Sequence, residues 1–153
     1  AHAMVDRASA HGLDARFFLR TPEGGYTAEV RRVYREVDAW DAECSIELHF
    51  NAAGASATGT ETLHSGGARS RRLAAHVQAQ MLARLRLRDR GLLERRTGRG
   101  SLSLMAGRAP AILVEPFFGS NRIDRLSAAA LGGPEGFAEM YMAGLKAYAE
   151  DVA

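Results

Sequence analysis

The sequence predicts an α/β fold: a single three-layer domain in which a mostly parallel, twisted sheet is flanked by helices on both faces. Strand-like segments alternate with helical segments of ten or more residues, the pattern of a parallel sheet with helical crossovers. The most continuous apolar run, APAILVE at 109–115, suits a central strand covered on both faces. The chain has 153 residues, 46% of them hydrophobic, which is enough for one core, and no repeat or linker divides it.

The first third of the chain is expected to form two helices with a strand between them. A short helix runs from residue 1 to about residue 10 and stops at Gly12, a residue type that favours this position. The run ARFFLR at 15–20 reads as a buried strand, and TPEGG after it reads as a turn. Thr27 is a candidate N-cap for a second helix that closes at Trp40. Its apolar residues recur at helical spacing: Val30, Val33, Tyr34 and Val37.

The remaining elements follow from the same two periodicities. CSIELHF at 44–50 and GTETLH at 59–64 read as strands, and a long helix follows that ends before Gly91. Its apolar stripe is Leu73, Val77, Met81 and Leu85. A glycine-bearing connection then leads to the strand at 109–115, and two helices complete the chain, at 122–131 and from Pro134 to about 150.

Composition excludes several classes of protein. No stretch approaches the roughly 20 apolar residues that span a bilayer, and the N-terminus lacks the basic-then-apolar order of a signal peptide. The lone Cys44 rules out an intramolecular disulfide and a multi-cysteine zinc site. The cellular compartment therefore stays open at this point.

The net charge of +2 conceals a basic segment at 69–99, which holds ten arginines and only two acidic residues. Two interpretations remain: a solvated helix face, or a surface that attracts a polyanion such as nucleic acid or an acidic wall polymer. The segment has few aromatic residues, so it lacks the stacking platforms of a single-strand nucleic-acid binder.

The segment CSIELHFNAAG at 44–54 brings polar side chains together. Strand alternation places Glu47, His49 and Asn51 on one face and the apolar residues between them on the other. His49 is either a structural histidine or a metal ligand at the edge of an active site. Ligands of open α/β sheets gather at the carboxyl ends of the strands, where His49 and Glu115 are both expected.

Glu115 ends the most apolar strand of the chain. An unpaired carboxylate there is costly to bury, so it needs a cation, a hydrogen-bonding partner or a raised pKa. This makes Glu115 a candidate general base or acid. The remaining histidines read as structural or solvated: His2, His11, His64 and His76.

A series of motifs then occurs in a specific order: SIELHFNAAG, GTETLH, LAAHVQAQML, Arg-Gly at 90–91, and PAILVEPFFGSN at 110–121. In this order and spacing, the sequence from about residue 16 onward resembles the zinc-dependent N-acetylmuramoyl-L-alanine amidases of bacterial cell-separation enzymes and phage endolysins. The resemblance implies an amidase/phosphorylase-like version of the α/β fold. It also implies that His49 is a zinc ligand and Glu115 the catalytic carboxylate.

Other roles implied by the resemblance are supporting ones. Asn51, Phe118 and Asn121 correspond to local supports, and Glu47 is a candidate to orient the ring of His49. The family opens with a strand that ends in a Gly-His-Gly-Gly turn, followed by a glutamate, and these supply the other two zinc ligands. Neither motif occurs here. We therefore expect residues 1–153 to form one amidase-like catalytic domain that lacks its first strand and loop and binds zinc weakly.

The function implied is a peptidoglycan hydrolase that cleaves the amide bond between N-acetylmuramic acid and L-alanine of the stem peptide with zinc-activated water. Such an enzyme works in the periplasm, outside the cell, or from a phage against the host wall. Peptidoglycan is the expected partner, without nucleic acid, membrane insertion or oligomerisation. Two alternatives remain: a non-catalytic peptidoglycan-binding relative with an incomplete zinc site, and a nucleic-acid-binding module using the basic segment at 69–99.

Overall fold

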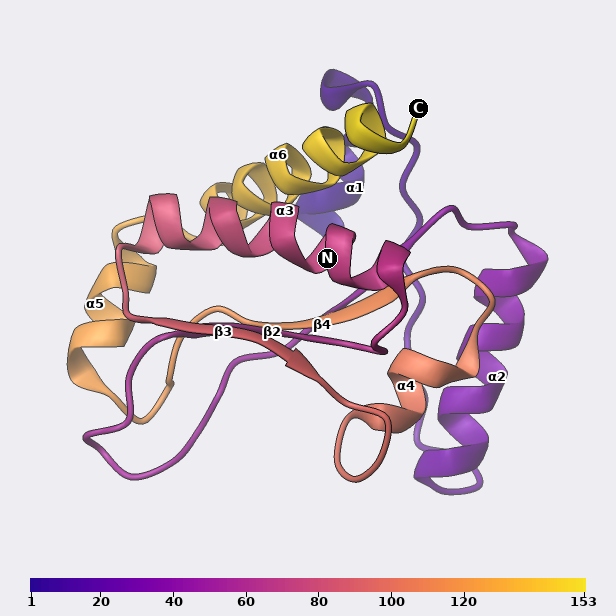
Figure 1. The fold of residues 1–153 in the computed structure, drawn as a ribbon, viewed down its shortest axis with the longest axis horizontal. Helices are drawn as coiled ribbons and strands as arrows, with labels where there is room; N and C mark the ends of the chain where they lie inside the picture. The colour runs from indigo at the N-terminus through magenta and orange to yellow at the C-terminus, as the bar shows by residue number, and fades with distance from the viewer.

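The computed structural model describes residues 1–153, which form a four-stranded sheet between two layers of helices (Figure 1). The sheet order is β1-β4-β2-β3. The strands are β1 (Ser45–Leu48), β2 (Thr60–His64), β3 (Asp89–Glu94) and β4 (Ala111–Glu115). The pairs β1–β4 and β2–β3 are parallel, and β2–β4 is antiparallel. The predicted three-layer α/β domain is confirmed, with a mixed sheet in which β4 is central and almost fully buried.

One face of the sheet carries the main core under three helices. These are α1 (His2–Ala8), α3 (Ala68–Leu85) and α6 (Pro134–Val152), and α3 and α6 lie side by side above the sheet (Figure 1). The apolar stripe predicted on α3 is buried, with Leu73, Val77 and Met81 each 0% exposed. It packs against Ile112 and Val114 of β4 within one cluster.

The opposite face carries a smaller core under α2 (Tyr26–Ala39) and α4 (Ser101–Ala106). Val30 and Tyr34 of α2 pack there with Leu113 of β4. The apolar side predicted for α2 therefore lies against the sheet, as expected for an amphipathic helix. Glu115 follows Leu113 on the same face of β4 and lies beyond this cluster, half-buried.

Two predictions about the first third of the chain are wrong. Residues 15–20 form no strand, because they pair with none of the four strands of the sheet; Phe18 instead packs on Trp40, and Arg32 donates to the Leu19 carbonyl. Thr27 is not the N-cap of α2, which begins one residue earlier and is preceded by Gly25 with a φ of 85°. The short first helix is confirmed and continues into the 3-10 helix η1 (Ser9–His11), with Gly12 left-handed after it.

The connection expected between the long helix and the strand at 109–115 contains two further elements, β3 and α4. β3 is an edge strand with the sequence DRGLLE, and α4 has only six residues, so neither produces a clear periodicity. The last two helices lie near their predicted positions, as α5 (Arg122–Ala129) and α6. None of the helices combines the length and the apolar character that crossing a membrane requires.

Candidate active site at one edge of the sheet

Strand direction brings the predicted site residues to a single edge of the sheet. β1 and β4 are parallel, so His49 and Glu115 lie at neighbouring strand ends. β2 runs antiparallel to β4, so the beginning of β2 lies at the same edge, with Glu61 directly opposite Glu115. Three titratable side chains from three separate segments thus gather where a substrate is expected to bind.

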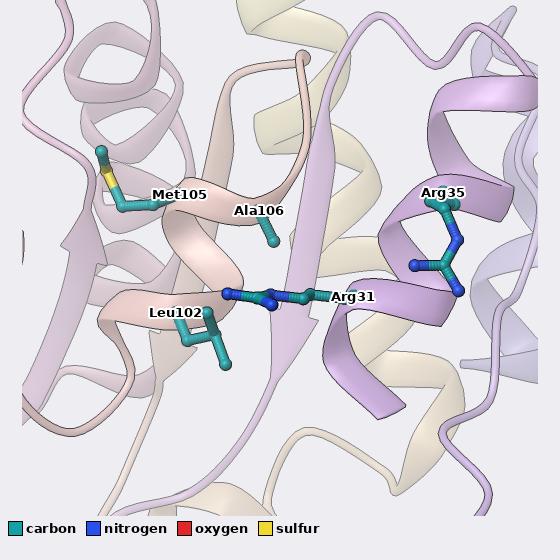
Figure 2. A pocket seen from close by; sticks show the side chains of 5 residues that line it. All are labelled: Arg31, Arg35, Leu102, Met105 and Ala106. Carbon is teal, nitrogen blue, oxygen red and sulfur yellow. The ribbon is translucent and has the colours of Figure 1, made fainter. Parts of the chain in front are cut away.

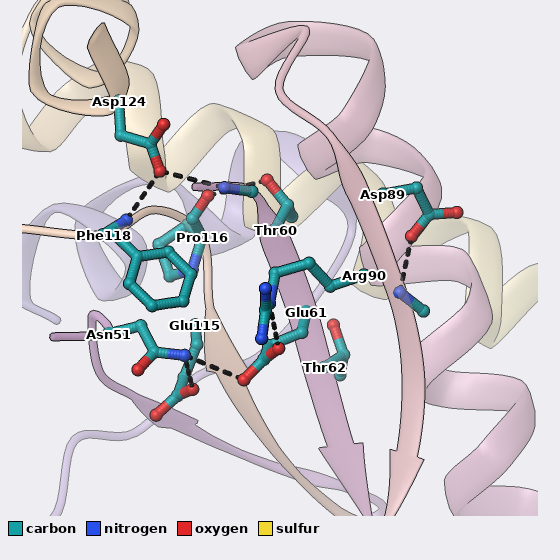
Figure 3. Close-up of polar contacts among 12 residues, drawn as sticks. Asn51, Thr60, Glu61, Thr62, Asp89, Arg90, Glu115, Pro116, Phe118 and Asp124 are labelled. Carbon is teal, nitrogen blue, oxygen red and sulfur yellow. Dashed lines mark hydrogen bonds and ion pairs between the residues drawn. The ribbon is translucent and has the colours of Figure 1, made fainter. Parts of the chain in front are cut away.

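Asn51 connects the two glutamates. Its Nδ2 donates to Oε1 of Glu61 at 2.8 Å and to Oε2 of Glu115 at 2.5 Å (Figure 3). Its backbone is fixed against the segment that follows β4, because its N–H donates to Phe117 O at 2.9 Å and its carbonyl accepts from Gly119 N–H at 2.8 Å. Asn51 therefore fixes the positions of the Glu61 and Glu115 carboxyl groups relative to each other.

Arg90 of β3 binds Glu61, the more buried of the two glutamates. Its Nε lies 2.5 Å from Oε2 of Glu61, whose side chain is 8% exposed (Figure 3). The Arg90 guanidinium also lies 4.9 Å from the centre of the Phe118 ring. Two carboxylates directly opposite on antiparallel strands repel each other. The contacts from Arg90 and Asn51 offset that repulsion.

The pKa of Glu115 is raised to about 7, first by burial and then by a hydrogen bond with Glu61 and the negative charge of Glu61. The positive charges of His49 and Arg99 act in the opposite direction. A carboxyl group with a pKa near neutrality can both accept and return a proton at physiological pH. This property suits Glu115 to acid–base chemistry.

His49 lies at the same edge with its side chain 45% exposed, so it is not a core histidine. Its Nε2 lies 3.2 Å from Oε1 of Glu47. The hydrogen bond to Glu47 raises the pKa of His49 against the effect of partial burial. Burial alone would raise the pKa of Glu47, but hydrogen bonds from His49 and Ser103 lower it overall. Carboxylate–histidine pairs of this kind orient metal-ligating imidazoles.

The donors at this edge provide only part of a zinc site. Oε2 of Glu47 is buried without a hydrogen-bond partner, which suits a neighbouring cation. Nowhere in residues 1–153, however, do three or more histidine, cysteine or acidic side chains come together as a metal-binding group. Zinc in proteins takes at least three such ligands. The chain thus offers one histidine with its carboxylate, and no complete ligand set.

Asn121 lies in the segment that follows β4, directly before α5. Its side-chain oxygen caps α5 by accepting from Ile123 N–H at 2.8 Å and Asp124 N–H at 3.2 Å, and its Nδ2 donates to Ala55 O at 3.0 Å. Asp124, 0% exposed, accepts from the N–H groups of Gly59 and Phe118 at 3.0 and 2.9 Å. These bonds tie the start of β2 to the segment after β4 and hold Glu61 beside Glu115.

Sequence reasoning missed Glu61, Arg90 and Asp124. Glu61 had one available signal: it is a charged residue inside GTETLH, a run that the sequence predicts to be a strand. Arg90 lies on a strand that was not predicted, and Asp124 resembles any acidic residue in the first turn of a helix. The contacts of Glu61 and Arg90 arise from pairing between strands, which a single sequence does not display.

Three of the other histidines lie away from this edge: His11, His64 and His76. His11 binds Glu139 at 3.0 Å and His76 binds Asp151 at 3.1 Å. His64 is buried at the far end of β2, and burial lowers its pKa. A cavity of about 380 Å³ lies between α2 and α4, lined by Arg31, Arg35 and apolar residues of α4 (Figure 2). It contains none of the site residues.

Solved structures with the same fold include several amidases. An N-acetylmuramoyl-L-alanine amidase from Clostridium difficile 630 superposes with a TM-score of 0.80 at 23% identity, covering 99% of this chain and 81% of that one. The catalytic domain of the CD27L endolysin, which targets the same species, gives 0.80 at 21% identity, with 94% and 77% covered. The amidase CwlV from Paenibacillus polymyxa gives 0.78 at 16% identity, with 97% and 80% covered. At these identities the likeness establishes the fold.

Sequence comparison establishes the family. The protein YqiI of Bacillus subtilis (strain 168) is 40% identical over 62 residues, a region that spans 39% of this chain and 30% of YqiI. The family model for N-acetylmuramoyl-L-alanine amidase matches residues 14–147, and this range includes every residue of the candidate site. The chain therefore belongs to the N-acetylmuramoyl-L-alanine amidase family, a family of peptidoglycan hydrolases.

Proposed function

We propose that this chain hydrolyses the amide bond between the lactyl group of N-acetylmuramic acid and L-alanine of the stem peptide, with Glu115 moving the proton. The observation that carries the proposal is the half-buried Glu115 carboxyl, whose pKa is raised to about 7 at the sheet edge that also holds His49. Membership in the amidase family supports the choice of substrate.

Amide hydrolysis needs an activated water and a proton for the departing amine. Glu115 in its ionised form takes a proton from the attacking water, and Glu115 in its protonated form then gives it to the leaving nitrogen. The Asn51 amide, which donates to Oε2 of Glu115, fixes the carboxyl during both transfers. The negative charge of Glu61 makes the carboxyl a stronger base than an ordinary glutamate.

The family is generally zinc-dependent. We propose that His49 supplies one zinc ligand and that Glu47 orients its ring through the 3.2 Å contact. When bound, zinc polarises the scissile carbonyl and lowers the pKa of a water to about 7. Since residues 1–153 bring together no complete ligand set, we expect this chain by itself to bind zinc weakly.

Amidases of this family act on the cell wall. We accordingly propose that the chain works in the periplasm or outside the cell, or acts from a phage on the host wall. We further propose that it acts as a monomer and that nucleic acid is not its partner. The incomplete ligand set favours one alternative, a relative that binds peptidoglycan without cleaving it.

Digestion of purified peptidoglycan in zinc-supplemented buffer tests the proposal, with mass spectrometry to detect free stem peptides. We expect the parent chain to release them and Glu115→Gln to release none while keeping its circular dichroism spectrum. His49→Ala should lose both activity and bound zinc. Glu150→Gln, at a side chain 67% exposed on α6, is the matched control and should match the parent.

Release at the parental rate by Glu115→Gln would rule out Glu115 as the proton-transfer group. A parent that sediments with sacculi but releases no peptide would favour the non-catalytic alternative.

A further inference from the structure

The carboxyl of Glu115 belongs to a chain of contacts that crosses the sheet from β3. Arg90 binds Oε2 of Glu61 at 2.5 Å, and Asn51 bridges Oε1 of Glu61 to Glu115 with bonds of 2.8 and 2.5 Å (Figure 3). Both oxygens of Glu61 are therefore occupied. Its carboxyl cannot rotate away from Glu115 without breaking one of these bonds.

We propose that Glu61 and Arg90 are positioning residues for the reaction: Glu61 sets the electrostatic field at Glu115, and Arg90 fixes the Glu61 carboxyl and balances its charge. This inference rests on the proposed function, because it takes Glu115 to be the proton-transfer group. The effect of Glu61 on Glu115 and the effect of Arg90 on Glu61 both follow from the hydrogen bonds and the ion pair described above.

The bonds from Arg90 and Asn51 offset the cost of a glutamate at position 61, but a neutral residue would need no such compensation. The Glu61 side chain is 8% exposed and lies directly opposite a second carboxylate, so it carries both a desolvation cost and a repulsion. A neutral residue of the same shape would keep the strand pairing without either cost. The arrangement fits a residue retained for its effect on Glu115.

Other charges also face Glu115. His49, at the end of β1, and Arg99, in the segment before α4, both oppose the effect of Glu61 on the pKa of Glu115. Glu47 lies next to His49, with Oε1 at 3.2 Å from the His49 Nε2. Glu61 thus acts to raise the pKa of Glu115, whereas His49 and Arg99 act to lower it.

Two substitutions should therefore move the pKa of Glu115 in opposite directions. Glu61→Gln removes the negative charge and keeps the shape, so the pKa of Glu115 should fall by about one unit or more. Arg90→Gln leaves the charge of Glu61 unbalanced, so the pKa of Glu115 should rise. Arg90→Lys keeps a positive charge and should stay closer to the parent.

The pKa of Glu115 can be read without substrate or zinc. Carbon-13 NMR of glutamate-labelled chains follows each carboxyl through a pH titration, and the Glu115→Gln spectrum assigns the Glu115 signal. Arg96→Gln is the matched control, because Arg96 Nε binds an exposed glutamate, Glu94, at 2.6 Å. This control should leave the Glu115 titration unchanged. Circular dichroism shows whether each variant is folded.

Opposite shifts in Glu61→Gln and Arg90→Gln support the inference, and the acid limb of the kcat/KM profile should move in the same two directions. Shifts of the same sign, or no shift in folded variants, would overturn it. Opposite shifts in a chain that cleaves no peptidoglycan would sink the proposed function and leave the electrostatic coupling intact. Cleavage of peptidoglycan without shifts in the pKa of Glu115 would support the proposed function and overturn the coupling between Glu61 and Glu115.

Discussion

The Glu115 carboxyl lowers the stability of the folded chain at the pH where it is ionised. Burial and Glu61 raise its pKa from 4.5 to about 7, so the folded state holds this proton more tightly than the unfolded state does. The bound proton therefore adds to the free energy of unfolding. This contribution is fully present below about pH 4.5 and is lost as the pH rises through about 7. Active sites commonly contain groups with such shifted pKa values, although these groups lower the stability of the folded protein.

Glu115→Gln should therefore stabilise the chain relative to the parent, and more so at high pH. The amide stays neutral at all pH values, so the difference in unfolding free energy should grow between about pH 5 and about pH 8. Urea denaturation at both values measures it. Glu150→Gln is the control and should show a difference that is small and independent of pH. A difference for Glu115→Gln that shrinks with rising pH would contradict the raised pKa.

At the scale of elements, α3 and α6 pack closely against each other on the main core face. An added methyl group at Gly144 of α6 would lie 2.8 Å from the Val77 Cα and 3.1 Å from Val77 Cγ2. The backbone of α3 cannot yield as a flexible side chain can. The two helices approach this closely only because residue 144 has no side chain.

Gly144→Ala should lower the unfolding free energy by about 1–3 kcal/mol, since overpacking outweighs the better helix propensity of alanine. Chemical denaturation measures the loss. Gly54→Ala is the control, because an added methyl there meets nothing within 4 Å and should change stability little. A stabilised Gly144→Ala variant would show that α3 and α6 separate freely.

The elements differ in how well the sequence predicts them. The stripe on α3, the run AILV in β4 and the TETLH strand are long or apolar enough to define both type and burial, and all are confirmed. Residues 15–20 are strand-like in composition, but composition does not supply a neighbour for pairing. β3 and α4 are too short or too polar to be detected.

The same limit applies to the candidate site. His49 and Glu115 were predicted from their positions at strand ends and from the family resemblance, and the structure places both at one edge of the sheet. Glu61 and Arg90 become recognisable only when the antiparallel β2–β4 register and the edge strand β3 are known. The roles that we propose for them rest on contacts between residues distant in sequence, which one sequence does not reveal.

At the scale of the whole molecule, charge is unevenly distributed. The segment 69–99 carries ten arginines and two acidic residues, whereas the chain has a net charge of only +2. The four arginines predicted to face solvent are exposed: Arg69, Arg72 and Arg84 on α3, and Arg88 in the connection between α3 and β3. Arg72 has an acidic neighbour, Asp151 at 3.4 Å, in a surface pair that adds little stability.

Replacing Arg69, Arg72, Arg84 and Arg88 with glutamine should leave the melting temperature nearly unchanged. Digestion of whole sacculi at low salt should slow, because long-range attraction to the anionic wall is lost. At physiological ionic strength, where the screening length is about 8 Å, the variant and the parent should digest sacculi at similar rates. Turnover of a small soluble muropeptide should not change. A large loss on the small substrate would place one of these arginines at the active site.

The central claim, that this chain cleaves the muramoyl–L-alanine amide, is tested most directly by digesting peptidoglycan in water labelled with oxygen-18. Hydrolysis of that bond adds the water oxygen to the lactyl carboxyl of muramic acid and leaves a free amine on L-alanine. We predict one label in the lactyl carboxylate and none in the released stem peptide. Label in a peptide carboxyl group, or at the anomeric carbon of a sugar, would show that a different bond is cut and would contradict the account.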